Sequence, residues 1–351
     1  MAEPVAIALD AMGGDNAPGM VIKGAHLARK RFPRITFHVF GDEARLAPLL
    51  AKHPKLARVT TVHHTDQVVK SDDKPSVALR AGRGSSMRLA LDSVRDGLAA
   101  GVVSAGNTGA LMAIAKFVLK TLPGIDRPAI ASFFPTIRGE SVMLDLGANV
   151  ECDADNLVQF AVMGNVFART VLGVLRPTMG LLNVGSEEMK GHEALREAAA
   201  ILRATNLPGE FQGFVEGDDI AKGTVDVIVT DGFTGNISLK SIEGTAKLYS
   251  EFLRQTFRSS ILAKLGYLLA RPALNGLRSR VDPRRYNGAI LVGLNGIVVK
   301  SHGGTDAFGF ANAIAVAMDM AVNGAIEKIK DDFAHLSATP PAAPAAQAAG
   351  A

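Results

Sequence analysis

The sequence has one cysteine, Cys152, among 351 residues, and no tryptophan. A single cysteine excludes an intramolecular disulfide and any zinc site made of cysteine thiolates. Scarce cysteine is typical of cytosolic proteins, so we expect a cytoplasmic location. The first 15 residues also lack a basic segment ahead of their short apolar run, which contains Asp10, and we therefore expect no signal peptide.

Long apolar runs are absent as well. No stretch reaches the roughly 20 residues needed to cross a bilayer without an interrupting charge or break. Hydrophobic residues nevertheless make up 48% of the chain, and glycines number 36. This composition favours an α/β enzyme rich in glycine turns over a disordered or fibrous protein.

Several familiar catalytic motifs are missing from the sequence. It contains no G-x-S-x-G elbow, no H-E-x-x-H pair, no Walker A loop and no G-x-G-x-x-G after a strand. Cys152 has no evident activating neighbour. We therefore expect no covalent nucleophile, and a site that works by positioning two substrates.

Strands that end in polar, glycine-bearing turns recur along the chain. Residues 225–229 are typical of a buried parallel strand, and the turn 231–236 leads directly into a helix. The turn 104–109 follows a strand in the same way, with G-N-T-G in the place of G-F-T-G. Residues 4–9 with the turn 10–18 begin the chain on the same pattern. Such turns can hold an anion against the first N–H groups of the next helix.

The alternation of strands and helices predicts a three-layer α/β/α fold with a doubly wound, mainly parallel sheet. We expect a single domain over residues 1–336, ending in one apolar helix from 306 to about 331, and a disordered Ala/Pro-rich tail over 337–351. In such sheets the carboxyl ends of the strands form the binding crevice, so the polar turns are expected to gather there.

Positive charge is concentrated in residues 247–285, which have nine basic and two acidic residues, a net charge of +7. The rest of the chain then has a net charge of −3, so this basic segment is expected to face an acidic partner. An apolar stripe accompanies the charge, at Leu253, Phe257, Ile261, Leu265 and Leu268. We expect a long helical region from 240 to about 270, a break at Pro272, Asn275 and Gly276, and a shorter helix after it.

The polar turns contain groups that suit phosphate or a developing oxyanion, namely backbone N–H groups, amides, hydroxyls, a lysine and a histidine. These side chains are Asn16, Asn107, Asn149, Asn236, Thr108, Thr234, Thr305, Lys190 and His302. Structural roles remain open for three of them. Lys190 can lie on a solvated helix face, Asn236 can cap a helix, and His302 can be a structural histidine.

Carboxylates also occur in these turns. Asp10, Asp15 and Asp231 can serve as turn or cap residues. Together with Asp145 these carboxylates could in principle bind a metal ion. Their separations in the sequence do not establish that they lie close together in the fold, and we predict no metal site.

Six segments together resemble the phosphate acyltransferases of the PlsX family, in order and over nearly all of the chain up to about residue 330. They are LDAMGGDNAP (9–18), SAGNTGALMA (104–113), MLDLGANVECD (143–153), NVGSEEMKG (183–191), TDGFTGN (230–236) and HGGTDAFGFANAI (302–314). The basic segment and the tail are less distinctive.

This resemblance implies a fold related to phosphate acetyltransferases and to isocitrate and isopropylmalate dehydrogenases, with a protruding helical segment, and a homodimer. It implies transfer of a fatty acyl group from acyl carrier protein to inorganic phosphate, giving acyl phosphate for phospholipid biosynthesis. A membrane glycerol-3-phosphate acyltransferase would act downstream, and no cofactor or nucleic acid is expected. The chemistry agrees with the residues, because phosphate is already a nucleophile and a thioester is already activated.

Lys190 and Asn236 are the catalytic candidates that follow from the resemblance. Lys190 would pair with phosphate or the tetrahedral oxyanion, and Asn236 would orient the thioester carbonyl. The turns around them would bind phosphate and substrate. These residues are Asp10, Gly13, Gly14, Asp15, Asn16, Gly106, Asn107, Thr108, Gly109, Asn149, Asp231, Gly232, Thr234, Gly235, His302 and Gly303.

Alternatives stay open for both the activity and the basic segment. An NAD-dependent decarboxylating dehydrogenase of the isopropylmalate type is favoured only by analogy of fold, and a phosphate-responsive, membrane-associated protein would not be an enzyme. The basic segment could face acidic acyl carrier protein or anionic lipid at a peripheral membrane contact. Its apolar stripe could also be buried in a dimer or a helical hairpin.

Overall fold

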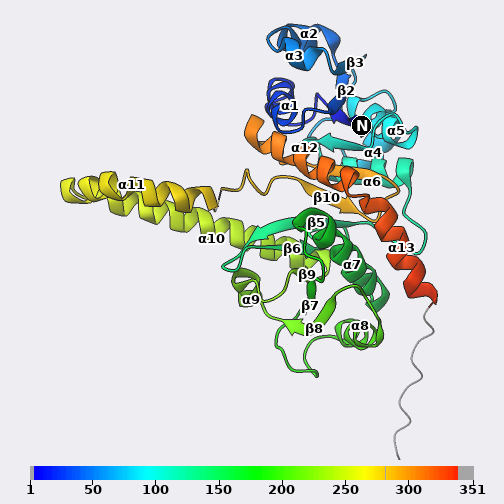
Figure 1. Cartoon of the computed structure of the whole chain (residues 1–351), viewed down its shortest axis with the longest axis vertical. Helices are drawn as coiled ribbons and strands as arrows, with labels where there is room; N and C mark the ends of the chain where they lie inside the picture. The colour runs from blue at the N-terminus through cyan, green and yellow to red at the C-terminus, as the bar shows by residue number, and fades with distance from the viewer. Residues whose placement is uncertain (1–3, 281, 339–351) are drawn as a thin grey trace, which may run out of the picture.

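A computed structural model describes residues 4–280 and 282–338 and contains one eleven-stranded sheet (Figure 1). The order across the sheet is β3-β2-β1-β4-β11-β10-β5-β6-β9-β7-β8. The strands are β1 (Val5–Asp10), β2 (Ile35–Gly41), β3 (Thr60–His64), β4 (Gly101–Ser104), β5 (Ala129–Pro135), β6 (Glu140–Leu144), β7 (Thr178–Leu182), β8 (Glu210–Val215), β9 (Val227–Val229), β10 (Ala289–Val292) and β11 (Ile297–Lys300).

The sheet is mainly parallel, but its direction reverses near the middle. Strands β3, β2, β1, β4 and β11 are parallel to one another, and so are β6, β9, β7 and β8. Between them β10 is antiparallel to both of its neighbours, and β5 is antiparallel to β6. These three reversals make the two parallel halves run in opposite directions, which the sequence analysis did not predict.

Helices connect most of the strands, and their bounds are as follows. They are α1 (Gly19–Arg31), α2 (Glu43–Ala51), α3 (Pro54–Ala57), α4 (Pro75–Ala81), α5 (Ser86–Arg95), α6 (Thr108–Leu119), α7 (Ala154–Phe167), the π-helical η1 (Ala168–Leu172), α8 (Glu193–Ala204), α9 (Gly217–Lys222), α10 (Gly232–Arg258), α11 (Ile261–Arg280), α12 (Ala307–Val322) and α13 (Ala325–Ala338).

The core lies in two layers, one on each face of the sheet. Successive strand residues alternate between them: Ile7 and Leu9 of β1 pack on one face with α1, α7, α8, α12 and α13, whereas Ala8 packs on the other with α4, α5 and α6. This alternation follows from the two-residue period of a strand, and burial on both faces explains why the strands are almost wholly apolar. The predicted three-layer α/β/α fold is confirmed.

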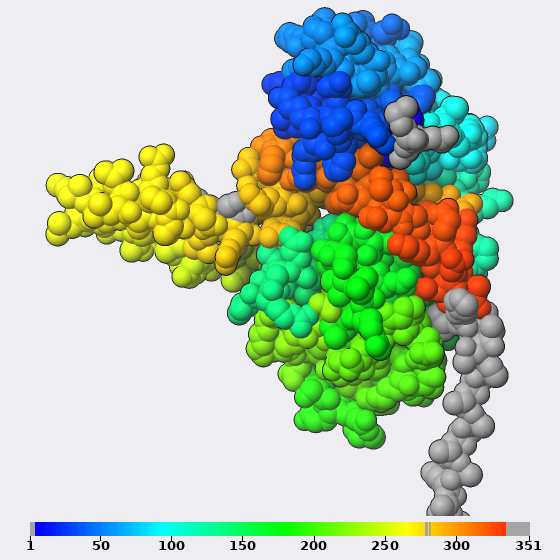
Figure 2. Space-filling view, viewed as in Figure 1, coloured from blue at the N-terminus to red at the C-terminus, as the bar shows by residue number. Residues whose placement is uncertain are grey.

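Helices α10 and α11 form an arm that projects from the body (Figures 1 and 2). They pack against each other, with the rings of Phe257 and Tyr267 5.4 Å apart. The prediction of a break at Pro272 is wrong: Pro272 lies inside α11, where it is exposed and water can bond the carbonyl that the proline leaves free. The break falls at Ser259 and Ser260 instead, because the Ser259 hydroxyl donates to the carbonyl of Thr256 and the Ser260 hydroxyl accepts from Ala263 N.

The single apolar helix predicted from 306 to about 331 is two helices, α12 and α13. Asn323 and Gly324 separate them, with Gly324 at a φ of 62°, which favours glycine. Helix α12 is buried over most of its length, as its lack of a polar face predicted. Helix α13 includes Ser337 and Ala338, the first two residues of the predicted tail, and the tail residues 339–351 lie outside the described residues.

Among residues 4–280 and 282–338, no single helix is long and apolar enough to cross a membrane. The pair α12 and α13 reaches the necessary length and composition together, but it is bent by 52°. The core helix of a globular domain satisfies the same test, and α12 is such a helix.

Candidate functional site

The turns after β1, β4 and β11 meet at one edge of the first half of the sheet. Their strands are neighbours and run in parallel, so their carboxyl ends coincide. Asp15 N donates to the carbonyl of Gly303 at 2.9 Å, and the Asn16 amide donates to the carbonyl of Thr305 at 3.2 Å. A β-carbon on Gly13 would lie 2.8 Å from the backbone nitrogen of Gly106, so this close approach requires glycine.

Asp10 lies at the centre of this first group and is 1% exposed. Its carboxylate accepts hydrogen bonds from the hydroxyls of Ser86, at 2.6 Å, and Ser104, at 2.7 Å. Burial raises the pKa of Asp10, and the two serine hydrogen bonds oppose that rise. Asp10 therefore supports the turns from below rather than facing a substrate.

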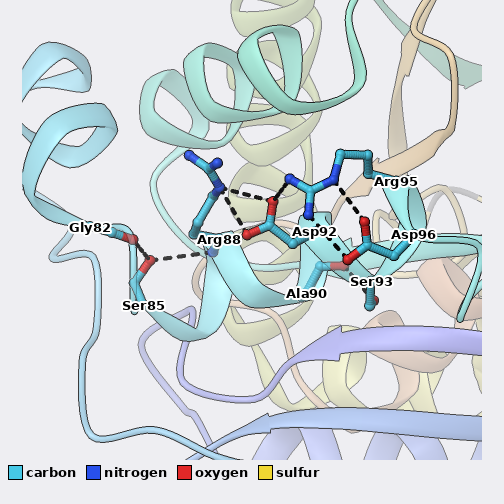
Figure 3. Close-up of polar contacts among 8 residues, drawn as sticks. All are labelled: Gly82, Ser85, Arg88, Ala90, Asp92, Ser93, Arg95 and Asp96. Atoms are coloured by element: carbon cyan, nitrogen blue, oxygen red, sulfur yellow. Dashed lines mark hydrogen bonds and ion pairs between the residues drawn. The ribbon is translucent and has the colours of Figure 1, made fainter.

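Ser86, which bonds to Asp10, is the first residue of α5, and Figure 3 shows the polar contacts that cap this helix and line its outer face. The Ser85 hydroxyl accepts from Arg88 N at 3.3 Å and donates to the carbonyl of Gly82 at 2.6 Å. On the outer face Asp92 accepts from Arg88 and from Arg95. These ion pairs are partly exposed, so most of the stability of α5 comes from its buried face rather than from charge.

Lys300, at the end of β11, is a further member of this group that the sequence analysis missed. It pairs in register with Ser104 of β4, and its Nζ donates to the carbonyl of Ser301. Burial lowers the pKa of Lys300 to about 8, and the charges of Asp10 and Asp15 partly offset the effect. The available signal was a lysine ending the otherwise apolar strand I-V-V-K.

Asn107 and His302 are engaged within the chain. The Asn107 amide donates to the carbonyls of Ser71 and Asp73 at 3.0 and 2.9 Å, and its oxygen accepts from Ala110 N as the N-cap of α6. His302 is exposed, and its Nδ1 accepts from Gly304 N at 3.2 Å. Thr108 is exposed and Gly109 half-buried at the start of α6, and Asn107 accepts from the next two N–H groups, those of Ala110 and Leu111.

A second group gathers the turns after β6, β9 and β7, which are also neighbouring parallel strands. Asp145 lies at the centre of this group. Its carboxylate accepts hydrogen bonds of 2.7–3.2 Å from the backbone N–H groups of Ile130, Gly147, Ala148 and Asn149. The Asn149 amide donates to Asp145 and to the carbonyl of Pro128. Asn149 and Asp145 therefore shape this turn.

The first turn of α10 is bound closely to Asp145 and Asn149. Gly232 N donates to the carbonyl of Asn149 at 2.7 Å. Asp231 caps the helix, because its two carboxylate oxygens accept from Thr234 N and from the Thr234 hydroxyl, both at 2.8 Å. Gly235 N donates to the Asp231 carbonyl. Three of the N–H groups that the sequence offered as anion donors are thus used within the chain.

Lys190 and Asn236 remain exposed at this edge of the sheet. Lys190 lies in the loop before α8, not on a helix, and the Asn183 amide closes this loop by donating to the Lys190 carbonyl at 3.1 Å. Asn236 lies on the first turn of α10, and a β-carbon on Gly147 would be 3.6 Å from its amide. These two side chains follow the neighbouring strands β7 and β9.

The hydrogen bonds and strand order therefore divide the predicted site residues into two groups. The turns at 10–16, 106–109 and 302–303 belong to one, and Asn149, Lys190 and the turn at 231–236 belong to the other. The four carboxylates of the imagined metal cluster divide in the same way. Within the described part of the chain, no group of three or more His, Cys, Asp or Glu side chains is placed to hold a metal ion.

Solved structures with the same arrangement define the class of fold. A phosphotransacetylase from Streptococcus pyogenes has a TM-score of 0.60 at 19% sequence identity and covers 91% of this chain and 94% of its own. The EutD phosphotransacetylase from Staphylococcus aureus has a TM-score of 0.58 at 19% identity, with the same coverage. The chain therefore has a phosphotransacetylase-like fold.

The sequence relatives are much closer. The family described as "Fatty acid synthesis protein" matches residues 5–328. A phosphate acyltransferase of Rhodospirillum centenum is 70% identical over 338 residues, covering 96% of this chain and 95% of the relative, and one of Rhodospirillum rubrum is 61% identical over 340 residues, covering 97% of each. The chain belongs to this family, the PlsX family of phosphate acyltransferases, and is a transferase enzyme.

Proposed function

We propose that the protein transfers a fatty acyl group from acyl carrier protein to inorganic phosphate, forming acyl phosphate for phospholipid biosynthesis. A phosphate oxygen attacks the thioester carbonyl carbon, and the tetrahedral intermediate collapses with cleavage of the carbon–sulfur bond. The sulfur leaves as a thiolate and takes up the proton that phosphate gives up. Because a cysteine-like thiol has a pKa of about 8.5, the leaving group needs little acid assistance.

The observation that supports the proposal is the exposure of Lys190 and Asn236 in the segments that follow the neighbouring strands β7 and β9. Most other polar side chains of the second group are bound within the chain, so these two are the groups free to meet a reactant. A cation and an amide donor suit the charge that develops on the carbonyl oxygen. Lys190 then stabilises phosphate or the oxyanion, and Asn236 orients the carbonyl.

The first group is proposed to hold phosphate, through Lys300 and the N–H groups of Thr108 and Gly109 at the start of α6. Sheet twist supports a shared crevice. Neighbouring strands rotate by about 20–25°, so the six steps from β1 to β9 accumulate about 120–150°. The strands of the two halves run in opposite directions along the sheet, and a twist of this size turns their carboxyl ends toward the same side in space. The two groups can then act on one pair of substrates.

Phosphate-dependent thiol release tests the proposed function directly. The purified chain is mixed with an acyl carrier protein thioester, and free thiol is measured with and without inorganic phosphate. We expect release only with phosphate, together with an equal amount of hydroxylamine-sensitive acyl phosphate. Release at the same rate without phosphate would identify a thioesterase, and no release would remove the assignment.

The arm is proposed to bring the enzyme to a membrane from the cytoplasm. Large apolar side chains are exposed near its tip, next to basic residues that can meet anionic lipid. They are Ile261, Leu262, Leu265, Leu268 and Leu269, with Arg258 and Lys264 beside them. Such a contact would release acyl phosphate where a membrane glycerol-3-phosphate acyltransferase can use it.

Flotation with liposomes of neutral or anionic lipid tests this contact. Binding that requires anionic lipid and is lost in Leu262→Glu supports it, and no binding to either liposome removes it. The homodimer is also a proposal, and light scattering at several concentrations tests it. Dimers retained in Leu262→Glu would separate the membrane contact from subunit association.

A further inference from the structure

Exposed apolar side chains occur in the turns that hold the two catalytic candidates and in the turn next to them. Each of the three turns of the second group presents at least one large apolar residue that the chain leaves open. They are Val150 after β6, Val184 and Met189 after β7, and Phe233 and Ile237 after β9, with exposed fractions of 65%, 81%, 82%, 59% and 51%. Isolated exposed apolar residues are ordinary on protein surfaces. Five of them in three adjacent turns are typical of a surface that binds an apolar ligand or partner.

Three of these apolar residues lie next to Lys190 or Asn236 in the sequence or on the same helix. Phe233 and Ile237 flank Asn236 on the first turns of α10, and Met189 directly precedes Lys190. Strands β6, β9 and β7 are consecutive in the sheet, and a spacing of about 4.8 Å places the outer two about 10 Å apart. The apolar residues therefore border the place where the thioester carbonyl would bind.

We propose that these five side chains, the acyl rim, bind the fatty acyl chain next to its carbonyl carbon. The proposal rests on the proposed function and names the part of the site that selects the length of the chain. A thioester whose carbonyl contacts Asn236 and Lys190 must start its hydrocarbon within reach of this rim. Apolar contact with the chain then removes both surfaces from water.

The exposed face of α10 continues the rim away from the turn. Leu248 and Phe252 are 54% and 55% exposed, and at 11 and 15 residues from Ile237 they lie about 20° and about 60° from it around the helix axis, on the same side of α10. Gly244 lies between, with no other atom within 4 Å of a β-carbon there, so the face is open at that point. A chain longer than the rim thus has an apolar surface to follow, and a short acyl group does not reach it.

A series of thioesters tests the acyl rim. The ratio of kcat/KM for hexadecanoyl over acetyl thioester is measured at saturating phosphate for the wild type, Phe233→Ala, Ile237→Ala and Met189→Ala. We expect each variant to lower this ratio at least tenfold, mainly through KM of the long substrate. Leu175→Ala is the matched control, because Leu175 is 88% exposed and precedes β7 at the opposite edge of the sheet. It should leave the ratio within twofold of the wild type.

Two results would overturn the acyl rim. An unchanged ratio in all three variants would show that the chain binds elsewhere. Loss of activity on every chain length together with conversion of a dimer to a monomer would show that a second copy covers the rim. Phe233→Leu, which keeps an apolar side chain, should recover most of the ratio and guards against a local defect in α10. Failure of the proposed function is distinguishable, since the wild type would then show no phosphate-dependent thiol release.

Discussion

The Ser104 hydroxyl donates a 2.7 Å hydrogen bond to the carboxylate of Asp10, joining the turn after β4 to the turn after β1. Asp10 is fully buried, and desolvation raises its pKa above the ordinary 3.8. A carboxyl whose pKa is higher in the folded state binds more protons there than in the unfolded chain. The contribution of Asp10 to stability therefore falls as the pH rises from about 3.8 to the raised pKa.

Asp10→Asn tests this first prediction, because an amide keeps the shape and does not titrate. We expect the free energy of unfolding of the wild type to fall relative to that of Asp10→Asn as the pH rises above about 4, and the difference to level off above the raised pKa. Urea denaturation followed by circular dichroism from pH 4 to pH 8 measures the difference. A constant difference over this range would mean that burial does not raise the pKa of Asp10.

The proposed role of Lys300 predicts that phosphate binding depends on pH. Because burial lowers its pKa to about 8, its ammonium loses its proton as the pH rises through that value. We expect KM for phosphate to rise above pH 8 in the wild type, and to be about tenfold higher at pH 7 in Lys300→Met, with no further rise near pH 8. Comparing the two enzymes at each pH cancels the ionisation of phosphate itself. Equal KM values at pH 7 would contradict a role for the Lys300 charge.

Lys190 and Asn236 are expected to act on turnover and not on stability. Both are exposed, so Lys190→Ala and Asn236→Ala should leave the melting temperature within about 2 °C and lower kcat by roughly 100-fold to 1000-fold, the usual cost of losing a donor to an oxyanion. Lys240→Ala is a control on α10, since its exposed ion pair with Glu243 contributes little. Wild-type kcat in both Lys190→Ala and Asn236→Ala would remove these residues from the proposed mechanism.

The regular part of the fold could be predicted because each strand, turn and helix has a local signature. Apolar runs of four to six residues, glycine turns and helical spacing indicated the three layers and the turns that border them. The reversal of the sheet was missed although part of it has a local signal. The links between β5 and β6 (136–139) and between β10 and β11 (293–296) are too short for the crossover that parallel neighbours need, so both pairs have to be antiparallel. Only the pairing of β10 with β5 joins strands that lie far apart in the sequence.

The hydrogen-bond partners of the polar side chains could not be predicted from the sequence either. Asn107 and Asn149 have the residue type of a phosphate ligand, but their partners are backbone carbonyls 34 to 37 and 21 residues away. Lys300 was missed for the opposite reason, because it ends an apolar strand and its neighbours Asp10 and Asp15 come from the first turn of the chain. Sequence patterns thus located the turns, and only the packing decided which side chains they leave free.

Cys152 offers a check on the electrostatics of the second group. Burial raises the pKa of its thiol to about 12, and the nearby carboxylates of Asp145 and Asp231 add to the rise. The thiolate is the reactive form, so at pH 8 alkylation by iodoacetamide should be about a thousandfold slower than for a thiol of pKa 9.0. Mass spectrometry over time measures the rate, with the urea-unfolded chain as the reference. If Cys152 were labelled as fast in the folded protein as in the unfolded chain, burial would not be raising the pKa of its thiol.

Gly235 and Gly244 make a matched pair on α10, because the same substitution should have opposite effects at the two positions. A β-carbon on Gly235 would overlap the carbonyl oxygen of Asp145, whereas one on Gly244 meets no other atom within 4 Å. Gly244→Ala should therefore stabilise the helix by about 1 kcal/mol, the difference in helix propensity between the two residues. Gly235→Ala should destabilise the fold by about 1–3 kcal/mol, as overpacking against a fixed backbone does.

Activity should separate the pair as clearly as stability. The shift forced by Gly235→Ala would displace Asn236 from the turn around Asp145, so kcat should fall along with the free energy of unfolding. Gly244→Ala lies two helical turns beyond Asn236 and should leave kcat with an acetyl thioester unchanged. Chemical denaturation and steady-state kinetics on both variants measure these effects. If Gly235→Ala kept wild-type stability and kcat, the close contact between α10 and Asp145 would not be what positions Asn236.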